Sequence, residues 1–199
     1  MMAAKPNAPS AERNKEAILE VLNEELRDRK AILEIGSGTG QHAIFFASRM
    51  PWLSWQTSDR IENHDGINAW LADANLVNVR APLELDVLEP VQFSDNFDAV
   101  FSANTAHIMS IGAVQCMFRI VGERLNDGGK FCLYGPFNQN DNFTSDSNRD
   151  FDMSLKSQDP VMGIRDLEKL DEFAATNGMQ RKSLFAMPAN NMIAVWQKN

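Results

Sequence analysis

The feature that most constrains this 199-residue chain is a short apolar run at 32–35 that breaks into alternate glycines at positions 36, 38 and 40. The run Ile-Leu-Glu-Ile has the composition of a buried parallel strand. Glycines in this spacing let the backbone turn sharply and approach a ligand where any Cβ atom would collide. An apolar helix pattern follows over 41–50. This order predicts a nucleotide-type cofactor loop, whereas a glycine-rich loop alone would predict only a tight turn.

The spacing of the glycines indicates which cofactor the loop binds. A dinucleotide loop has its third glycine at the sixth position, where this chain has Gln41. The chain also has an acid, Glu34, inside the strand and two positions before the first glycine. This combination resembles motif I of the class I S-adenosylmethionine-dependent methyltransferases. The resemblance implies that S-adenosylmethionine is the cofactor and that it is bound by Glu34, Gly36, Ser37, Gly38, Thr39 and Gly40.

A second strand pattern, over 52–59, ends in Asp59. This acid comes roughly 20 residues after the glycine loop, where a ribose diol needs an acceptor. A carboxylate accepts hydrogen bonds from both ribose hydroxyls at once. We therefore predict that Asp59 binds the ribose. The alternative is a helix N-cap, because an apparent helix follows from about Asp65.

A third strand pattern, over 81–87, also ends with an acid. Asp86 followed by the apolar Val87 resembles the adenine-binding motif of the same superfamily. The resemblance implies that the Asp86 carboxylate accepts from the adenine amine and that the backbone N–H of Val87 donates to the ring. A solvated acid at the end of a strand is the alternative for Asp86.

A fourth strand pattern, over 97–104, ends in Asn104. In class I methyltransferases this strand end faces both the sulfonium and the substrate, so Asn104 is a candidate for both the cofactor site and the catalytic site. His107 follows in the next loop, and its ordinary pKa suits a general base near neutral pH. The alternative for His107 is a capping or surface group.

The rest of the chain alternates helix and strand patterns. We expect a helix over 110–125 that stops at 127–129, a strand over 130–135, a helix over 164–177, and strands over 180–187 and 192–197. This alternation predicts an α/β fold with a Rossmann-like, doubly wound and mostly parallel sheet. The last two strands, joined by 188–191, predict the C-terminal antiparallel hairpin of the class I methyltransferase type. We expect a flexible tail over 1–9 and a single domain over 10–199.

A polar segment over 138–150 is dense in Asn, Asp and Ser and carries scattered phenylalanines. Polar loops longer than about 12 residues are uncommon inside compact domains unless they are functional or disordered. We therefore predict a substrate loop or lid here, with a surface insertion as the alternative.

Five motifs together resemble the methyltransferase-like twenty-six family, which is also catalogued as a domain of unknown function. They are Glu-Arg-Asn at 12–14, Ser-Gly-Thr-Gly-Gln-His at 37–42, Trp-Gln-Thr-Ser-Asp at 55–59, Asp-Pro-Val-Met-Gly-Ile-Arg-Asp at 159–166 and Met-Pro-Ala-Asn-Asn at 187–191. The resemblance spans nearly the whole chain and implies a methyltransferase of undefined substrate. The chain departs from the family pattern at Ala17 and Thr57, where prolines are common, and at Met162, where a tryptophan is usual.

The family resemblance adds site residues. It implies that Arg13 and Asn14 lie near the carboxylate end of the cofactor, where an arginine fork suits a carboxylate. Ordinary helix-start chemistry, with Ser10 as N-cap and Glu12 in the first turn, is the alternative. The family resemblance further implies that the acceptor side is lined by Tyr134, Asn138, Arg165, Asn190 and Asn191. Tyr134 joins His107 and Asn104 as an optional catalytic residue, although asparagines in turns usually serve turn geometry.

The composition limits the partners. The net charge is −8 and no basic run appears, which disfavours nucleic acid and favours a small neutral or cationic acceptor or a protein surface. The two cysteines predict buried free thiols in a reducing compartment. Three scattered histidines predict no metal site. The absence of a signal-type or membrane-spanning apolar run leads us to expect a cytoplasmic protein with no membrane partner.

Two other functions are compatible with this sequence. The first is a protein that binds S-adenosylmethionine without catalysis, as a sensor or assembly partner. The second is a nicotinamide-dependent oxidoreductase, which the missing sixth-place glycine and the terminal hairpin both disfavour.

Overall fold

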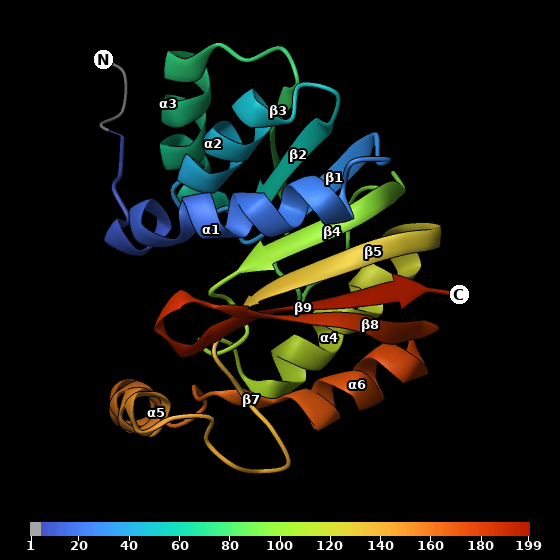
Figure 1. The fold of residues 1–199 in the computed structure, drawn as a ribbon. Helices are drawn as coiled ribbons and strands as arrows, with labels where there is room; N and C mark the ends of the chain where they lie inside the picture. Colours follow the sequence, from blue (N-terminus) through green and yellow to red (C-terminus); the bar gives the residue numbers. More distant parts are fainter. Residues whose placement is uncertain (1–4) are drawn as a thin grey trace.

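The chain folds around a large β-sheet that has helices on both faces (Figure 1). The computed structural model describes residues 5–199, so residues 1–4 of the predicted flexible tail lie outside the described residues. Within 5–199 this sheet has seven strands in the order β3-β2-β1-β4-β5-β9-β8. In chain order they are β1 (Ala31–Ile35), β2 (Ser54–Asp59), β3 (Val79–Glu84), β4 (Phe97–Ala103), β5 (Leu125–Gly135), β8 (Met179–Met187) and β9 (Asn191–Lys198).

Strands β1 to β5 run parallel. β1 pairs with β2 and β4, β2 pairs with β3, and β4 pairs with β5. Ile32 lies opposite Trp55 on one side and opposite Ala99 on the other. β9 lies antiparallel between β5 and β8, so it is the reversed strand beside the last parallel one. The predicted doubly wound sheet with a C-terminal antiparallel hairpin is confirmed.

Both faces of the sheet are buried. The helices on one face are α1 (Pro9–Glu25), α2 (Gln41–Arg49) and α3 (His64–Ala74), and those on the other are α4 (Ile111–Arg124) and α6 (Leu167–Thr176) (Figure 1). Consecutive strand residues point to opposite faces. Ile32 therefore belongs to the core that contains Phe46, and Leu33 belongs to the core that contains Phe118. Burial on both sides explains the continuous apolar run in β1.

The end of β3 differs from the prediction. β3 spans Val79–Glu84 instead of 81–87. The backbone N–H of Leu85 still donates to the carbonyl of Asp59, at 2.9 Å. The Asp86 carboxylate then accepts from the backbone N–H of Leu88, at 3.0 Å, which forms a side-chain turn directly after the strand.

Two other predicted starts were wrong. β5 begins at Leu125 instead of 130, because Leu125 pairs with Phe97 directly after α4 ends. The expected stop at 127–129 therefore lies inside a strand. α6 begins at Leu167 instead of 164, because Asp166 is its N-cap and accepts from the backbone N–H of Glu168 at 3.1 Å.

The polar segment contains a helix that the sequence pattern hides. Helix α5 (Asp146–Gln158) begins inside the predicted loop 138–150. Its N-cap Ser145 accepts from the backbone N–H of Asn148 at 3.1 Å. The buried face of α5 carries two polar side chains, Asn148 and Asp152, with only one apolar residue, Leu155. An apolar periodicity is therefore absent. The two short strands β6 (Phe137–Asn138) and β7 (Arg165–Asp166) flank this helix in the chain and pair with each other.

The described part of the predicted tail makes contacts with α3. Trp70 donates its indole N–H to the carbonyl of Pro6 at 2.8 Å, and Lys5 pairs with Asp73. Helix α1 begins at Pro9 with Ala8 at its N-cap position and no side-chain cap. Ser10 is therefore not the N-cap that the alternative interpretation expected.

Candidate functional site

The glycine loop joins β1 to α2 at the carboxyl edge of the parallel strands, where the sequence predicted a ligand. Its glycines at 36, 38 and 40 all have a positive φ, of 74°, 57° and 87°. A Cβ atom added to Gly36 would lie 2.6 Å from Cγ2 of Thr105, and one added to Gly40 would lie 3.2 Å from Cα of Ile67. A Cβ atom added to Gly38 would have no neighbour within 4 Å. Packing therefore requires two of the glycines, while Gly38 borders open space.

Glu34 supports the loop from inside the strand. The side chain is buried, and its Oε2 accepts from the Ser37 hydroxyl at 2.8 Å and from the Trp55 indole at 3.0 Å. Burial raises the pKa of Glu34 to about 7, and the two hydrogen bonds oppose this rise. Glu34 and Ser37 thus form one buried contact at the base of the loop.

Asp59 connects the end of β2 to the loop. Its Oδ2 accepts from the backbone N–H of Gly38 at 2.7 Å. Its Oδ1 accepts from the backbone N–H of Arg60 and the amide of Asn63, both at 2.8 Å. The N-cap residue of α3 is Asn63, so Asp59 does not have the capping role that the alternative gave it. A carboxylate has about four acceptor positions, so Asp59 retains capacity for a further donor.

Two residues for which the sequence predicted no site role, Gln41 and His42, attach α1 to the loop. Gln41, in the first turn of α2, donates to the Glu12 carboxylate at 2.8 Å. The neighbouring His42 donates from Nε2 to the Asn14 amide oxygen at 2.8 Å. Burial lowers the pKa of His42 to about 4, so its ring is neutral at pH 7. The two contacts bracket Arg13 and fix the first turn of α1 beside the glycine loop.

A cavity of about 450 Å³ lies next to this attachment. Its lining comes from α1, the end of β4, β5, the turn over 188–190 and the start of β9. The lining residues are Ser10, Arg13, Asn14, Asn104, Tyr134, Pro188, Ala189 and Asn191. The structure thus brings together five of the predicted site residues, Arg13, Asn14, Asn104, Tyr134 and Asn191. The Arg13 side chain makes no hydrogen bond or ion pair with another residue of 5–199.

The cavity wall contains two strained residues. Asn104 has a φ of 60° and Ala189 has a φ of 57°. Such backbone costs about 1–3 kcal/mol per residue and occurs most often at functional sites. Tyr134 faces the same cavity, and burial raises the pKa of its phenol, while Asn14 opposes the rise.

His107 does not line this cavity, and it packs against Gly135, whose Cβ position points to the opposite face of β5 from Tyr134. Its Nδ1 is 3.7 Å from where a Cβ atom on Gly135 would be, and Gly135 follows Tyr134. The ring is buried and packs edge-on against Phe151 of α5, with 5.3 Å between the ring centres. Burial, together with the nearby Arg165 cation, lowers the pKa of His107 to about 4. The imidazole is therefore neutral at pH 7.

The remaining predicted acceptor residues lie outside the cavity lining. Arg165 donates to backbone carbonyls, including that of Ala106 at 2.9 Å. The Asn190 amide donates to the hydroxyl of Ser147 on α5 at 2.9 Å. Asn138 has a buried amide oxygen without a partner in the described part of the chain. Asp86 caps the turn after β3, and the side chain of Val87 is buried.

The sequence of this chain matches a known protein family over nearly its whole length. Residues 5–198 match the sequence pattern of a family described as "Protein of unknown function (DUF938)". The chain belongs to this family.

Solved structures show which fold the DUF938 chain has. Similar ones include the S-adenosylmethionine-dependent methyltransferase SibL (TM-score 0.80, 17% identity, 95% of this chain and 55% of SibL covered) and an O-methyltransferase family protein from Burkholderia thailandensis (0.79, 14%, 93% and 56%). Human N-acetylserotonin methyltransferase, solved with SAM, is similar at a TM-score of 0.71 and 15% identity, with 93% of this chain and 55% of that chain covered. The DUF938 chain spans little more than half the length of these structures. It has the class I methyltransferase fold.

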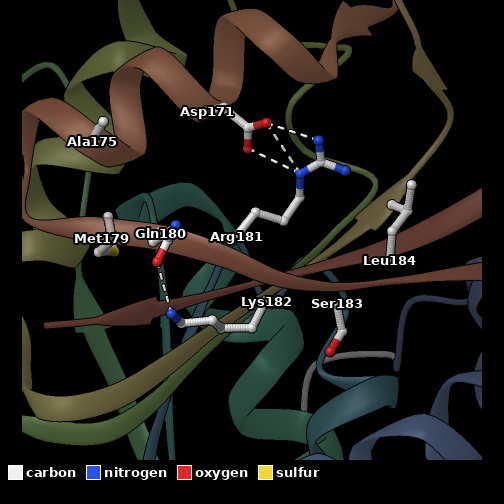
Figure 2. Close-up of a pocket in the computed structure, with 8 residues that line it drawn as sticks. All are labelled: Asp171, Ala175, Met179, Gln180, Arg181, Lys182, Ser183 and Leu184. Atoms are coloured by element: carbon white, nitrogen blue, oxygen red, sulfur yellow. Dashed lines mark hydrogen bonds and ion pairs between the residues drawn. The ribbon is translucent and has the colours of Figure 1, made fainter.

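A second cavity of the DUF938 chain, of about 510 Å³, lies between α6 and the edge strand β8 (Figure 2). Arg181 and Asp171 form a two-pronged ion pair on its wall, with the closest nitrogen and oxygen 2.8 Å apart. The cavity contains none of the predicted site residues.

The sequence also led to expectations about a metal site, a membrane span and the cysteines. Within residues 5–199, no group of three His, Cys, Asp or Glu side chains is placed to hold a metal ion. Over the same range, no helix is both long and apolar enough to cross a membrane. Both cysteines are free; Cys132 is buried, whereas Cys116 is only half-buried.

Proposed function

We propose that this protein is an S-adenosylmethionine-dependent methyltransferase that methylates a hydroxyl oxygen of a small, uncharged acceptor. The observation that carries the proposal is the open side of Gly38. The loop holds Gly38 in place from both sides, through Asp59 and through the packed glycines, yet nothing occupies the space that a Cβ atom would fill. Gly178 after α6 is equally open, so the gap at Gly38 supports a ligand because of its place: the glycine loop lies at the carboxyl edge of the parallel strands, where α/β sheets bind ligands.

The polar groups around the loop fit the parts of this cofactor. Arg13 is unpaired among the described residues, faces the cavity and suits the carboxylate of the methionine moiety. Asp59 would accept from the ribose, and Glu34 would support the loop beneath it. Asp86 and Val87 would hold the adenine, which is supported by their place after β3 at the same sheet edge.

The acceptor side supports an uncharged hydroxyl. Among the described residues that line the cavity, Arg13 is the only charged one, and it would be occupied by the cofactor carboxylate. A cationic amine would find no carboxylate there. An anionic acceptor would lack a second cation. The neutral lining favours a hydroxyl-bearing small molecule, and the cited O-methyltransferase structures share this fold.

His107 and Tyr134 are the residues that would handle the proton. S-adenosylmethionine, when bound, supplies a methyl group on a sulfonium and leaves as S-adenosylhomocysteine. His107, which is neutral at pH 7, would take the hydroxyl proton on Nδ1, the nitrogen nearest Gly135. Its lowered pKa makes it a weaker base than the ordinary histidine that the sequence predicted. Asn104 and Tyr134 would orient the acceptor, and this alignment would supply most of the rate.

We also propose that the chain groups with the methyltransferase-like twenty-six family. The support is that two of its quoted motifs contact each other: Glu12 meets Gln41, and Asn14 meets His42. These four residues hold α1 against the glycine loop, which explains why the two motifs occur in the same chain.

Calorimetric titration with S-adenosylhomocysteine tests the proposed function, with NAD as the comparison ligand. We expect micromolar binding of the former alone. Gly38→Val should abolish it, because the branched side chain would fill the cofactor space. Gly178→Val is the matched control, since Gly178 also has a positive φ of 72° and no neighbour within 4 Å of an added Cβ, but lies after α6.

The outcomes separate the possible functions. Full affinity in Gly38→Val would refute the site, and Gly38→Ala provides the same comparison if the valine variant does not fold. NAD binding would favour the oxidoreductase. Binding of S-adenosylhomocysteine without methylated product across a broad set of hydroxyl compounds would favour the non-catalytic alternative.

A further inference from the structure

The loop that carries His107 is held by a neighbouring segment, 161–165, at several backbone positions. Arg165 donates from Nε to the carbonyl of Ala106 at 2.9 Å and from Nη2 to the carbonyl of Met109. The backbone N–H of Gly163 donates to the carbonyl of His107 itself at 2.9 Å. The backbone is therefore fixed at His107 and on both sides of it.

The same guanidinium also fixes its own segment. Arg165 Nη2 donates to the carbonyl of Val161 at 2.9 Å. One side chain thus joins three carbonyls from two segments. A guanidinium has five N–H donors in a rigid plane, whereas the lysine ammonium is a single point with three. The arrangement therefore requires arginine specifically and leaves it with few donors for an acceptor.

Helix α5 supports this segment from behind. Asp152, only 3% exposed, accepts from the backbone N–H of Ile164 at 2.8 Å and pairs with Lys156 at 2.6 Å. A Cβ atom added to Gly163 would lie 2.9 Å from Oδ1 of Asp152, so the segment passes close over the helix. The adjacent Phe151 contacts the His107 ring directly.

We propose that Arg165 is a positioning residue for methyl transfer: it fixes the loop over 105–109 and thereby holds the His107 imidazole against Phe151 and beside Gly135. The catalytic meaning of this role rests on the proposed function, but the positioning itself does not. The charged groups around His107 are Arg165, with Asp152 and Lys156 behind it.

NMR of the histidine rings tests the role, because the chain has only three histidines. His107→Gln assigns the His107 signal, and Phe151→Leu measures the ring-current shift that the phenyl ring causes. In the wild type we expect His107 to titrate near 4 instead of its ordinary 6.5. In both Arg165→Lys and Arg165→Met, we expect the ring-current shift to be lost. In Arg165→Met the pKa should also rise toward 6.5, because charge and burial are both reduced. The His42 signal should stay unchanged as the internal control.

Two results would overturn the proposal. If Arg165→Lys keeps the wild-type ring-current shift, the arginine acts only as a charge. If Arg165→Met lowers the melting temperature while leaving the His107 signal unchanged, it acts only on the stability of the fold.

Titration of the same variants with S-adenosylhomocysteine keeps the two proposals apart. We expect the affinity to stay within about twofold of wild type, since the hydrogen bonds of the Arg165 side chain go to Ala106, Met109 and Val161 and not to the glycine loop. If wild type does not bind this ligand, the proposed function fails, yet the NMR result still decides whether Arg165 positions His107.

Discussion

At the scale of single residues, the three loop glycines differ in what they tolerate. Gly36 has both a positive φ and a close neighbour in Thr105, whereas Gly38 has the positive φ alone. A left-handed backbone costs a non-glycine residue about 1–2 kcal/mol, and forced overpacking typically adds about 1–3 kcal/mol.

We therefore predict that one alanine variant mainly loses stability and the other mainly loses ligand affinity. Gly36→Ala should lower the free energy of unfolding by about 2–5 kcal/mol, the sum of both costs. Gly38→Ala should lower it by only about 1–2 kcal/mol but should weaken S-adenosylhomocysteine binding strongly. Urea unfolding and calorimetry on both variants check this. Equal losses of stability would contradict the packing difference between the two glycines, and unchanged binding in Gly38→Ala would contradict the assignment of Gly38 to a ligand.

The buried Glu34 gives a second residue-scale prediction, on pH. Its pKa is raised from 4.5 to about 7, so the folded state binds the proton more tightly than the unfolded state. Stability from this group is therefore full below pH 4.5 and falls as the pH rises toward 7, by about 3 kcal/mol. Glu34→Gln keeps an oxygen acceptor for Ser37 and Trp55 but does not titrate. Wild type should lose stability relative to Glu34→Gln between these pH values in urea unfolding, and a constant difference would show that Glu34 does not ionise in this range.

A third residue-scale prediction concerns His107 as the proton acceptor. His107→Gln should leave S-adenosylhomocysteine affinity unchanged, because His107 makes no contact with the glycine loop. General-base catalysis contributes about 10²–10⁴-fold, so methylation of a hydroxyl acceptor should fall by about that factor. The methylation rate of the wild type should fall only as the pH approaches 4, because the imidazole then becomes protonated and cannot accept the hydroxyl proton. An unchanged rate in the variant would remove His107 from the mechanism.

At the scale of elements, helix α5 has few buried apolar contacts, so its N-cap contributes a larger share of its stability than in an ordinary amphipathic helix. Only Leu155 gives its buried face an apolar residue. We predict that Ser145→Ala lowers the free energy of unfolding by about 1 kcal/mol, the usual cost of losing an N-cap. Ser154→Ala, at an exposed position of the same helix, is the control and should have no cost. Thermal unfolding of both variants measures the difference, and equal melting temperatures would show that the cap is not needed.

The elements also show what the sequence could predict. The strands of the parallel sheet and the glycine loop follow from apolar runs and from glycine spacing, which act locally. Helix α5 lacks an apolar period, because Asn148 and Asp152 take buried positions through hydrogen bonds to distant backbone. The role of Arg165 was likewise hidden, since its partners are carbonyls that every residue carries. Gln41 and His42 left only a weak signal, their place directly after the glycines.

At the scale of the whole molecule, two cavities compete as the ligand site. One lies at the carboxyl edge of the sheet beside Arg13 and Tyr134, and the other lies between α6 and β8 around Arg181 (Figure 2). The second is slightly larger, but its polar groups already pair with each other, as Asp171 does with Arg181 and with the indole of Trp196. Parallel α/β sheets bind ligands at their carboxyl edge, so size alone does not decide between them.

Ligand-induced stabilisation decides between the two cavities. S-adenosylhomocysteine at 100 times its Kd should raise the free energy of unfolding by about 2.7 kcal/mol. Arg181→Met should lower the starting stability, because it leaves the partly buried Asp171 carboxylate without its cation, but it should keep the full ligand-induced increase. Arg13→Met should do the reverse, since Arg13 supports no described contact within the fold yet faces the carboxyl-edge cavity. An increase that disappears in Arg181→Met and survives in Arg13→Met would move the cofactor site to the α6–β8 cavity and would overturn the proposed function together with its site.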